Sequence, residues 1–433
     1  MIIKDLTVKN EYSYSILTCS LSRKTGTEPV FIAVPDKYYL DPHCADPFVL
    51  AFLLLACKND EDIIIEDGFV SEELAFNIES ILFPLLVKMG CGTGKTNINA
   101  QCIMHNYNAQ CTMHNAQYKC TMHNAHQRQK IFATGISLGV DSFYSVLNNI
   151  KDHNKIMHNA QCTMHNINAQ CTMHNAHQRQ ENPISATVYI YNTTLDKIKE
   201  GVPTGYAKPR EEVSEALGLE FIEILTNIDQ IMNTEFEFIN YHTFHNMACA
   251  LSLRNLIKGY YLATGYSYKE MNPSLTDTAS YENYIEKALN FSDFKMICSG
   301  GEVSRIEKTK FIAQNTIVQK YLNVCFLWKI NHKYINCSKC EKCIRTLLTL
   351  DVIGKLDCFS QVFDTDYYKK HKSYFWGFIF HEGYRSHNLL AQKIIIEAKN
   401  IGYKIPFTAY FSLIKIMLYN QTVKIKRFIN GRK

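Results

Sequence analysis

The sequence predicts an α/β protein with a doubly wound parallel sheet, because short apolar runs alternate with helical segments through its middle. The run "ISATVYIYN" is rich in β-branched and aromatic residues, which favour a strand, and "PREEVSEALG" ends on a glycine, as many helices do. In chain order we expect a strand at 184–192, a helix at 209–218, a strand at 221–228, a helix at 240–259 closed by Gly259, and a strand at 260–268. Ligands of such sheets bind beyond the carboxyl ends of the strands.

Two flanking regions complete the expected organisation. Residues 1–96 predict a small N-terminal α/β domain, and residues 351–433 are aromatic-rich and predict a helical C-terminal region. The strongest apolar run, Phe48–Cys57, is bracketed by Asp46 and Lys58 and is shorter than the roughly 20 residues that span a bilayer. This run therefore predicts a buried helix.

Charge and the first residues bear on partners and location. Lysine and arginine total 46 against 41 aspartate and glutamate residues, so the basic excess is small, and part of it lies in the C-terminal tail. This distribution is poor evidence for a nucleic-acid partner, and no apolar run predicts a membrane partner. Because the charged start "MIIKDLTVKN" lacks the apolar core of a secretory signal, we expect a cytoplasmic protein whose cysteines are thiols or metal ligands.

A short repeat, Met-His-Asn-Ala-Gln-Cys-Thr, fills two stretches of the chain, residues 97–129 and 154–180. The repeated base string ATGCACA encodes this heptapeptide and returns to frame, so a tandem DNA expansion into two surface loops explains it. The unit is too short and too broken for a solenoid. The histidines and cysteines of the repeats could bind metal, as such tracts often do, but expansion accounts for the same residues without selection for binding. The residues in question include His105, His114 and His123.

Between the two repeats, Lys130–Ile136 predicts a buried strand, and "DSFYSVLNNI" carries apolar residues at the spacing of one helix face. The turn between them contains small residues, which let backbone N–H groups approach a ligand, and a helix start adds partial positive charge. Together these features favour a phosphate group. Asp141 would repel phosphate unless its carboxylate binds a divalent cation or accepts hydrogen bonds within the loop. The turn consists of Ser137, Leu138, Gly139, Val140, Asp141 and Ser142.

A second glycine-rich segment, "GCGTGKT" at Gly90–Thr96, ends like a phosphate-binding Walker A loop. That pattern needs a glycine where Met89 stands and a strand before it, whereas the preceding residues predict a helix. We therefore do not expect this segment to bind phosphate.

Four cysteines, Cys325, Cys337, Cys340 and Cys343, form a Cys-x-x-Cys-x-x-Cys core with one upstream partner. Two-residue spacers let thiolates converge on one tetrahedral ion, so the pattern predicts a closed structural zinc site, with an iron–sulfur cluster as the alternative. Lys339 and Lys342 would offset part of the thiolate charge.

The turn Ser-Leu-Gly-Val-Asp-Ser resembles the S-G-G-x-D-S signature of the PP-loop ATP pyrophosphatases, with Leu138 in place of the first glycine. The cysteine pattern downstream resembles the zinc site of one member of that superfamily, 7-cyano-7-deazaguanine synthase. The match covers roughly residues 130–350 and excludes the second repeat. The N-terminal region resembles a less characterised branch that carries an extra N-terminal domain.

The resemblance implies an adenine nucleotide alpha hydrolase-like fold and an enzyme that uses ATP and Mg²⁺ to adenylate a carboxylate or carbonyl substrate. It also implies nucleotide contacts from the turn and from Gly265, and zinc at the cysteines of 325–343. In relatives a basic residue after the last core strand neutralises phosphate, which suggests Arg305 or Lys308 beside Asp141 as catalytic residues. Two alternatives stay open: a nucleotide-binding module without turnover, favoured by Leu138, and a zinc-ribbon scaffold for a protein or RNA partner.

Overall fold

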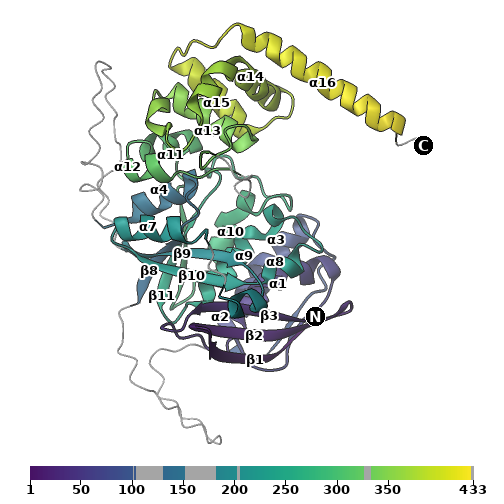
Figure 1. Ribbon diagram of the computed structural model, residues 1–433. Coiled ribbons are helices and arrows are strands. Elements are labelled where there is room, and N and C mark those ends of the chain that lie inside the picture. The colour runs from purple at the N-terminus through teal and green to yellow at the C-terminus, as the bar shows by residue number, and fades with distance from the viewer. Residues whose placement is uncertain (101, 104–129, 152–181, 202–204, 326–332, 431–433) are drawn as a thin grey trace, which may run out of the picture. The chain divides into compact units, whose positions relative to one another are not determined.

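The computed structural model describes residues 1–100, 102–103, 130–151, 182–201, 205–325 and 333–430 (Figure 1). The described chain forms two compact units. Unit 1 holds the residues up to 136, together with 149–151 and 182–301; unit 2 holds 137–148 and the residues from 302 onward. Most of the first repeat and all of the second, including His105, His114 and His123, lie outside the described residues.

Unit 1 is built on a ten-stranded sheet with the order β12-β11-β8-β9-β10-β3-β2-β1-β4-β6. A separate pair, β5 (Val70–Ser71) and β7 (Cys102–Ile103), is also parallel. The strands of the large sheet are β1 (Ile2–Glu11), β2 (Tyr14–Arg23), β3 (Gly26–Pro35), β4 (Ile63–Ile65), β6 (Ile98–Asn99), β8 (Ile131–Gly135), β9 (Ile184–Asn192), β10 (Glu220–Thr226), β11 (Ile257–Ala263) and β12 (Lys295–Ser299).

The five strands from β8 to β12 are parallel to one another, which confirms the expected parallel sheet in the middle of the chain. The strands β1, β2 and β3 form an antiparallel meander that joins the parallel part through β3 and β10, so the N-terminal strands extend the same sheet. The order of the parallel strands reverses between β8 and β11. Such a reversal opens a crevice at the carboxyl ends of the strands, where α/β sheets bind their ligands.

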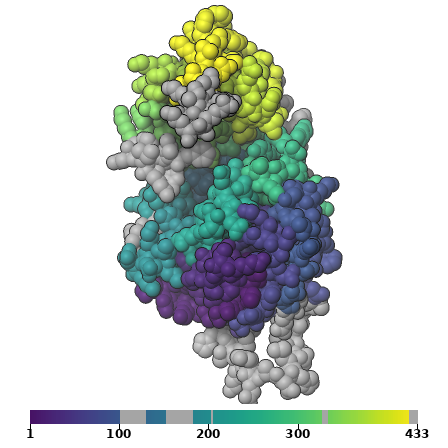
Figure 2. All heavy atoms as spheres, turned by 90° about the vertical axis from the view of Figure 1, so that its right-hand side faces the viewer, coloured from purple at the N-terminus to yellow at the C-terminus, as the bar shows by residue number. Residues whose placement is uncertain are grey.

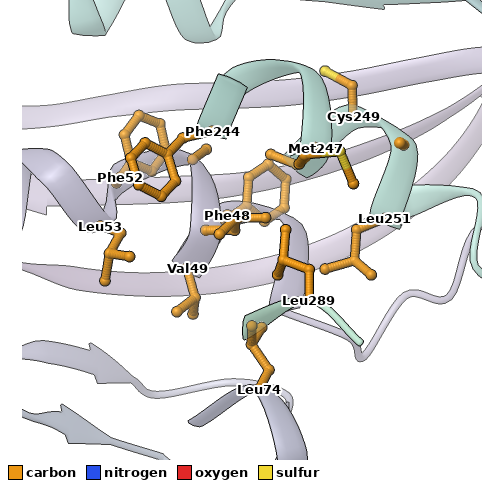
Figure 3. Packing of buried hydrophobic residues seen from close by; sticks show 14 of the residues in the cluster. Phe48, Val49, Phe52, Leu53, Leu74, Phe244, Met247, Cys249, Leu251 and Leu289 are labelled. Carbon is orange, nitrogen blue, oxygen red and sulfur yellow. The ribbon is translucent and has the colours of Figure 1, made fainter. Parts of the chain in front are cut away.

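Helices cover both faces of the sheet. On one face, α1 and α9 pack together in a large apolar core, shown in Figure 3. On the other face, Ile198 of α6 packs against Phe31 and Leu225 of the sheet. The helices of unit 1 are α1 (Asp46–Asn59), α2 (Glu72–Asn77), α3 (Phe83–Lys88), α6 (Leu195–Lys199), α7 (Lys208–Ala216), α8 (Ile228–Met232), α9 (Phe238–Ser252) and α10 (Glu282–Ala288), with a π-helical turn at Ile78–Leu82 and a 3-10 turn at Thr278–Tyr281.

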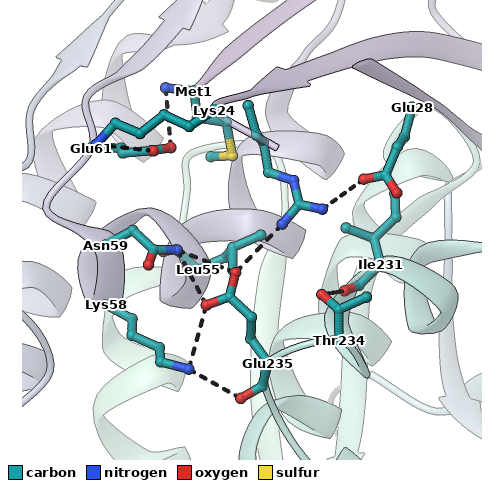
Figure 4. Close-up of polar contacts among 11 residues, drawn as sticks. Met1, Lys24, Glu28, Leu55, Lys58, Asn59, Glu61, Ile231, Thr234 and Glu235 are labelled. Atoms are coloured by element: carbon teal, nitrogen blue, oxygen red, sulfur yellow. Dashed lines mark hydrogen bonds and ion pairs between the residues drawn. The ribbon is translucent and has the colours of Figure 1, made fainter. Parts of the chain in front are cut away.

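Helix α1 is the buried helix expected from the apolar run Phe48–Cys57, all of which is inaccessible to solvent. Its first residue, Asp46, is also buried, and Arg254 neutralises it with a nitrogen–oxygen distance of 2.8 Å. The same guanidinium donates hydrogen bonds to both carboxylate oxygens of Asp293. Arg254 therefore links the start of α1 to the segment that precedes β12. Figure 4 shows a more exposed network around Glu235, which contacts Arg23 and Lys58.

The sequence predicted that two glycines, Gly218 and Gly259, end helices. Gly218 follows α7 with φ +69°, as expected for a residue that ends a helix. The expectation that Gly259 closes a helix is wrong: α9 ends at Ser252, and Gly259 lies inside β11. A Cβ atom on Gly259 would meet the Phe132 ring at 2.2 Å, so the glycine serves strand packing.

The segment Gly90–Thr96 follows helix α3 and not a strand, in agreement with its exclusion as a Walker A loop. A Cβ atom on Gly92 would meet the Cys57 carbonyl at 1.9 Å, so this loop is packed against the end of α1.

Unit 2 is helical, which confirms the expected helical C-terminal region for its described residues. None of the helices described for this chain is long and apolar enough to cross a membrane. The helices are α4 (Val140–Asn149, up to residue 148 in this unit), α11 (Arg305–Ile312), α12 (Thr316–Tyr321), α13 (Glu341–Val352), α14 (Thr365–Tyr384), α15 (Leu389–Asn400) and α16 (Thr408–Asn430), with a 3-10 turn at Leu356–Phe359.

Candidate anion site and cysteine metal centre

The turn that begins unit 2 is held by its own serines. The Ser142 hydroxyl accepts a hydrogen bond from the Ser137 backbone N–H at 2.9 Å, and the Ser137 hydroxyl accepts one from the Gly139 N–H at 3.3 Å. Ser142 is buried whereas Ser137 is exposed. The serines therefore shape the loop itself, and the chain passes directly from β8 through this loop into α4.

Leu138 stands in the left-handed region, with φ +67°, where a glycine would be free of strain. Its side chain is buried, and its carbonyl accepts a hydrogen bond from the Asn323 N–H at 2.9 Å. The position that departs from the PP-loop signature is therefore one where the backbone requires a positive φ. Burial of the leucine and the Asn323 contact hold this conformation.

The start of α4 offers backbone donors. The first N–H groups of a helix have no partner within it, and no acceptor among the described residues satisfies those of Val140 and Asp141. A Cβ atom on Gly139 would lie 3.3 Å from the Ser137 hydroxyl, which is tighter than an ordinary contact, so the turn suits a glycine at this position. These groups favour an anion.

Asp141 is neutralised by two cations from α11. The Arg305 guanidinium donates a hydrogen bond of 2.7 Å to Oδ2, and the Lys308 ammonium lies 3.6 Å from Oδ1. The Lys308 side chain is only 1% exposed, whereas that of Arg305 is 29% exposed. The cations meet at Asp141 because both lie in the first turn of α11, whose N-terminus is capped by Ser304 and Glu307. All three predicted catalytic residues are thus brought together.

Two further cations from α13 join this group. Burial and repulsion from Arg305 and Arg345 lower the pKa of Lys342, and Asp141 only partly offsets them. Burial also lowers the pKa of Arg345; Glu341 opposes this effect, and Arg305 adds to it. Arg345 also forms an ion pair with Glu341, and the mutual repulsion of Arg305, Lys342 and Arg345 means that an added anion would stabilise these cations. We call the group of Arg305, Lys308, Lys342 and Arg345, with Asp141 among them, the cation cluster.

Tyr144 packs beside the cation cluster. Its ring lies 5.8 Å from the Lys308 ammonium and packs edge-on to Phe311, while its hydroxyl donates to Glu302 at 3.0 Å. Burial and the nearby Glu302 raise the pKa of Tyr144, so the phenol stays neutral. This residue belongs to the apolar face of α4 and fixes Lys308 by packing.

Gly265 lies in unit 1 and follows β11. A Cβ atom there would make only an ordinary contact with Ala279 at 3.4 Å. The neighbouring carboxylates have local roles: Glu270 accepts hydrogen bonds from the Ser267 N–H and hydroxyl, and Asp277 accepts one from the Ala279 N–H.

The four expected cysteine ligands converge. Their sulfurs lie within 4.8 Å of one another, and three of the pairs are separated by 3.4, 3.8 and 3.9 Å. A tetrahedron with zinc–sulfur bonds of about 2.3 Å has edges of about 3.8 Å. A cluster with several iron atoms would hold its cysteines further apart. Cys325, Cys337, Cys340 and Cys343 therefore suit one tetrahedral ion such as zinc, with no position left open for a substrate.

The surrounding backbone prepares the sulfurs for negative charge. The N–H groups of Lys339 and Cys340 point at the Cys337 sulfur at 3.4 and 3.2 Å, a geometry that Ser338 permits by adopting φ +60°. Buried Asn336 donates to the carbonyls of Leu322 and Val362 and so ties the two cysteine-bearing segments together. Such support orients the ligands of a metal. Cys340 also precedes α13, so the metal centre holds the start of the helix that carries Lys342 and Arg345.

Comparisons of the chain with protein-family models, with curated proteins and with solved structures found no match. The assignment of a function therefore starts from the residues alone.

The sequence did not predict that Lys342 and Arg345 belong to an anion site. Their only signal was a pair of basic residues, three positions apart, on either side of Cys343, and such a pair also suits charge compensation for thiolates.

Proposed function

We propose that the protein is an ATP pyrophosphatase of the PP-loop type that adenylates a carboxylate or carbonyl substrate. The observation that carries this proposal is the cation cluster beside a serine-shaped helix start. A triphosphate carries several charges, and the cluster holds Arg305 and Lys308 on Asp141, Lys342 within the field of that carboxylate, and Arg345 in an ion pair with Glu341. The strand order is consistent with it, because β8, which leads into the turn, borders the reversal of the parallel strands. The adenine nucleotide alpha hydrolase-like fold belongs to the same proposal.

In this reaction a substrate oxygen attacks the α-phosphorus of ATP, a new phosphorus–oxygen bond forms, and the bond to the β-phosphate oxygen breaks. Pyrophosphate leaves with the bonding electrons. The N–H groups of Val140 and Asp141 and the side chains of Arg305 and Lys308 are placed to hold phosphate oxygens and neutralise the leaving group. Asp141 positions the two cations before ATP arrives.

The residues of the cluster do not form a magnesium site of their own. Asp141 is the carboxylate at the turn, and both of its oxygens face cations, whereas a magnesium ion prefers several free oxygen ligands. Any magnesium would enter with the phosphates of the nucleotide, and we derive no step through it. The cysteine centre takes no part in bond making and supports α13.

The test is product analysis with purified, zinc-replete protein and [α-³²P]ATP, with a panel of small carboxylic acids as substrates. The proposal expects AMP and pyrophosphate in equal amounts, with no ADP, once an accepted substrate is present. Arg305→Ala should lower the rate at least a hundredfold, whereas Lys310→Ala, which alters an exposed lysine on the same helix, should leave it unchanged. Formation of ADP, or an equal rate in Arg305→Ala, would contradict the proposal.

The second candidate is a nucleotide-binding module without turnover. The strained, buried Leu138 at the phosphate turn favours it, because a leucine there restricts how closely the loop approaches a ligand. This module would bind ATP but release neither AMP nor pyrophosphate with any substrate. Restoring the glycine with Leu138→Gly would then be needed for product to appear.

A further inference from the structure

The last helix, α16, has an apolar face that no described part of the chain covers. Phe407, just before it, is 74% exposed, and Phe411, Ile414 and Leu418 within the helix are each more than half exposed. We call Phe407, Phe411, Ile414 and Leu418 the apolar stripe. The C-terminal helices appear in yellow-green and yellow in Figure 2. Large apolar residues that line up at the surface mark an interaction site.

The opposite face of α16 packs against α14. Gly377 lets α14 approach so closely that a Cβ atom there would meet Ser412 at 2.7 Å. The Asn420 amide meets His381, and Ser373 meets Thr408, along the same seam. These contacts fix the rotation of α16 and turn the stripe away from α14.

The spacing of the stripe matches a paired helix. Its residues are separated by four, three and four positions, and the sequence continues this rhythm through Gln421, Ile425 and Phe428. This alternation averages 3.5 residues and defines the a and d positions of a heptad, the seam along which one helix packs on another. A single polar residue at a seam position, here Gln421, specifies the register of a helix pair.

The charge of the C-terminal segment indicates the kind of partner that α16 would bind. Every ionised side chain after Glu397 is a lysine or an arginine. In the heptad frame, Lys415 and Lys424 fall at the e and g positions, which flank the seam and set partner choice. Two copies of α16 paired with each other would bring together two segments whose ionised side chains are all basic, so self-pairing is disfavoured.

We propose that α16 docks a helix of another protein, one with heptad-spaced apolar residues flanked by glutamate or aspartate. The inference does not depend on the proposed ATP chemistry. The covered seam with α14 holds α16 in place, and the apolar stripe supplies the contact area. The flanking lysines supply the selectivity for an acidic partner.

The test uses two synthetic 28-residue peptides with leucine and isoleucine at the a and d positions and either glutamate or lysine at every e and g position. Binding to the full-length protein is followed by fluorescence anisotropy. The glutamate peptide should bind at least tenfold more tightly than the lysine peptide. Because salt screens charges, raising the salt concentration should reduce this ratio of affinities. The double substitution Ile414→Glu/Leu418→Glu should abolish binding of the glutamate peptide. The control Ile396→Glu, at an exposed apolar residue of α15, should leave this binding intact.

Equal affinity for both peptides, or unchanged binding in Ile414→Glu/Leu418→Glu, would overturn the proposal. Sedimentation of the protein alone supplies another outcome: dimers that this double variant dissociates would make a second copy the occupant. Flotation with phosphatidylserine vesicles that the double variant abolishes, without peptide selectivity, would make a lipid surface the occupant. Both results contradict an acidic helix as the partner, and circular dichroism of the variants verifies that they are folded.

Discussion

Arg305 and Asp141 form an ion pair of 2.7 Å between α11 and the start of α4, and the two residues are 164 positions apart in the chain. Lys308 approaches the other oxygen of the same carboxylate from a fully buried position. Because Asp141 serves two cations, its charge organises the cluster.

Neutralising Asp141 should separate its structural role from its effect on anions. We expect Asp141→Asn to lower the free energy of unfolding by about 2 kcal/mol, since a buried cation loses a charged partner. We also expect pyrophosphate to raise the melting temperature of this variant more than that of the wild type, because the freed cations attract anions. A thermal shift titration measures both effects. Loss of the pyrophosphate effect in Asp141→Asn would show instead that the carboxylate itself assists anion binding.

In most helices a glycine variant is less stable than the alanine variant, and the positive φ of Leu138 should reverse this order of stability. Both substitutions remove a buried side chain, but only glycine relieves the positive φ, by about 1 kcal/mol. Leu138→Gly should therefore be more stable than Leu138→Ala in denaturant titrations. At Leu147, a buried leucine within α4, the order should be alanine above glycine. The same order at both positions would argue against strain at Leu138.

Removing the metal should weaken the anion site as well as the fold. We expect one zinc ion per chain by elemental analysis, lost in Cys337→Ser and retained in Cys358→Ser, a cysteine of unit 2 outside the cluster. Because Cys340 precedes α13, chelation should also lower the affinity for pyrophosphate at least fivefold, as Lys342 and Arg345 lose their position. Full pyrophosphate affinity in the metal-free protein would limit the centre to a role in stability.

Acid should destabilise unit 1 through His245. Burial lowers the pKa of this histidine, an effect that Asp229, 3.5 Å away, and Asn246 only partly offset. The unfolded chain therefore binds the proton more readily, and stability that is present above pH 6.5 is lost as the pH falls below it. His245→Gln should flatten the dependence of unfolding free energy on pH between 6.5 and 5. His43→Gln, at an exposed histidine, is the matched control. An equal slope in wild type and His245→Gln would contradict this assignment.

The sequence predicted the parts of this protein that depend on local patterns. The strand at 184–192 is found at β9 with the same bounds, and the cysteine spacing converges because two-residue spacers allow little else. Gly259 was misread because a glycine can end a helix or make room for a ring, and only the pairing of β11 with Phe132 decides between the two. The cation cluster was found in part, since Arg305 and Arg345 are brought together only by the packing of α11 and α13.

The most direct test of the phosphate assignment is calorimetric titration of ATP into the zinc-replete protein, carried out side by side with Arg305→Gln and Lys310→Gln. The account predicts one ATP per chain in the wild type, affinity at least tenfold weaker in Arg305→Gln, and affinity within twofold of wild type in Lys310→Gln. Absence of ATP binding by the wild type, or the same affinity in Arg305→Gln, would contradict it.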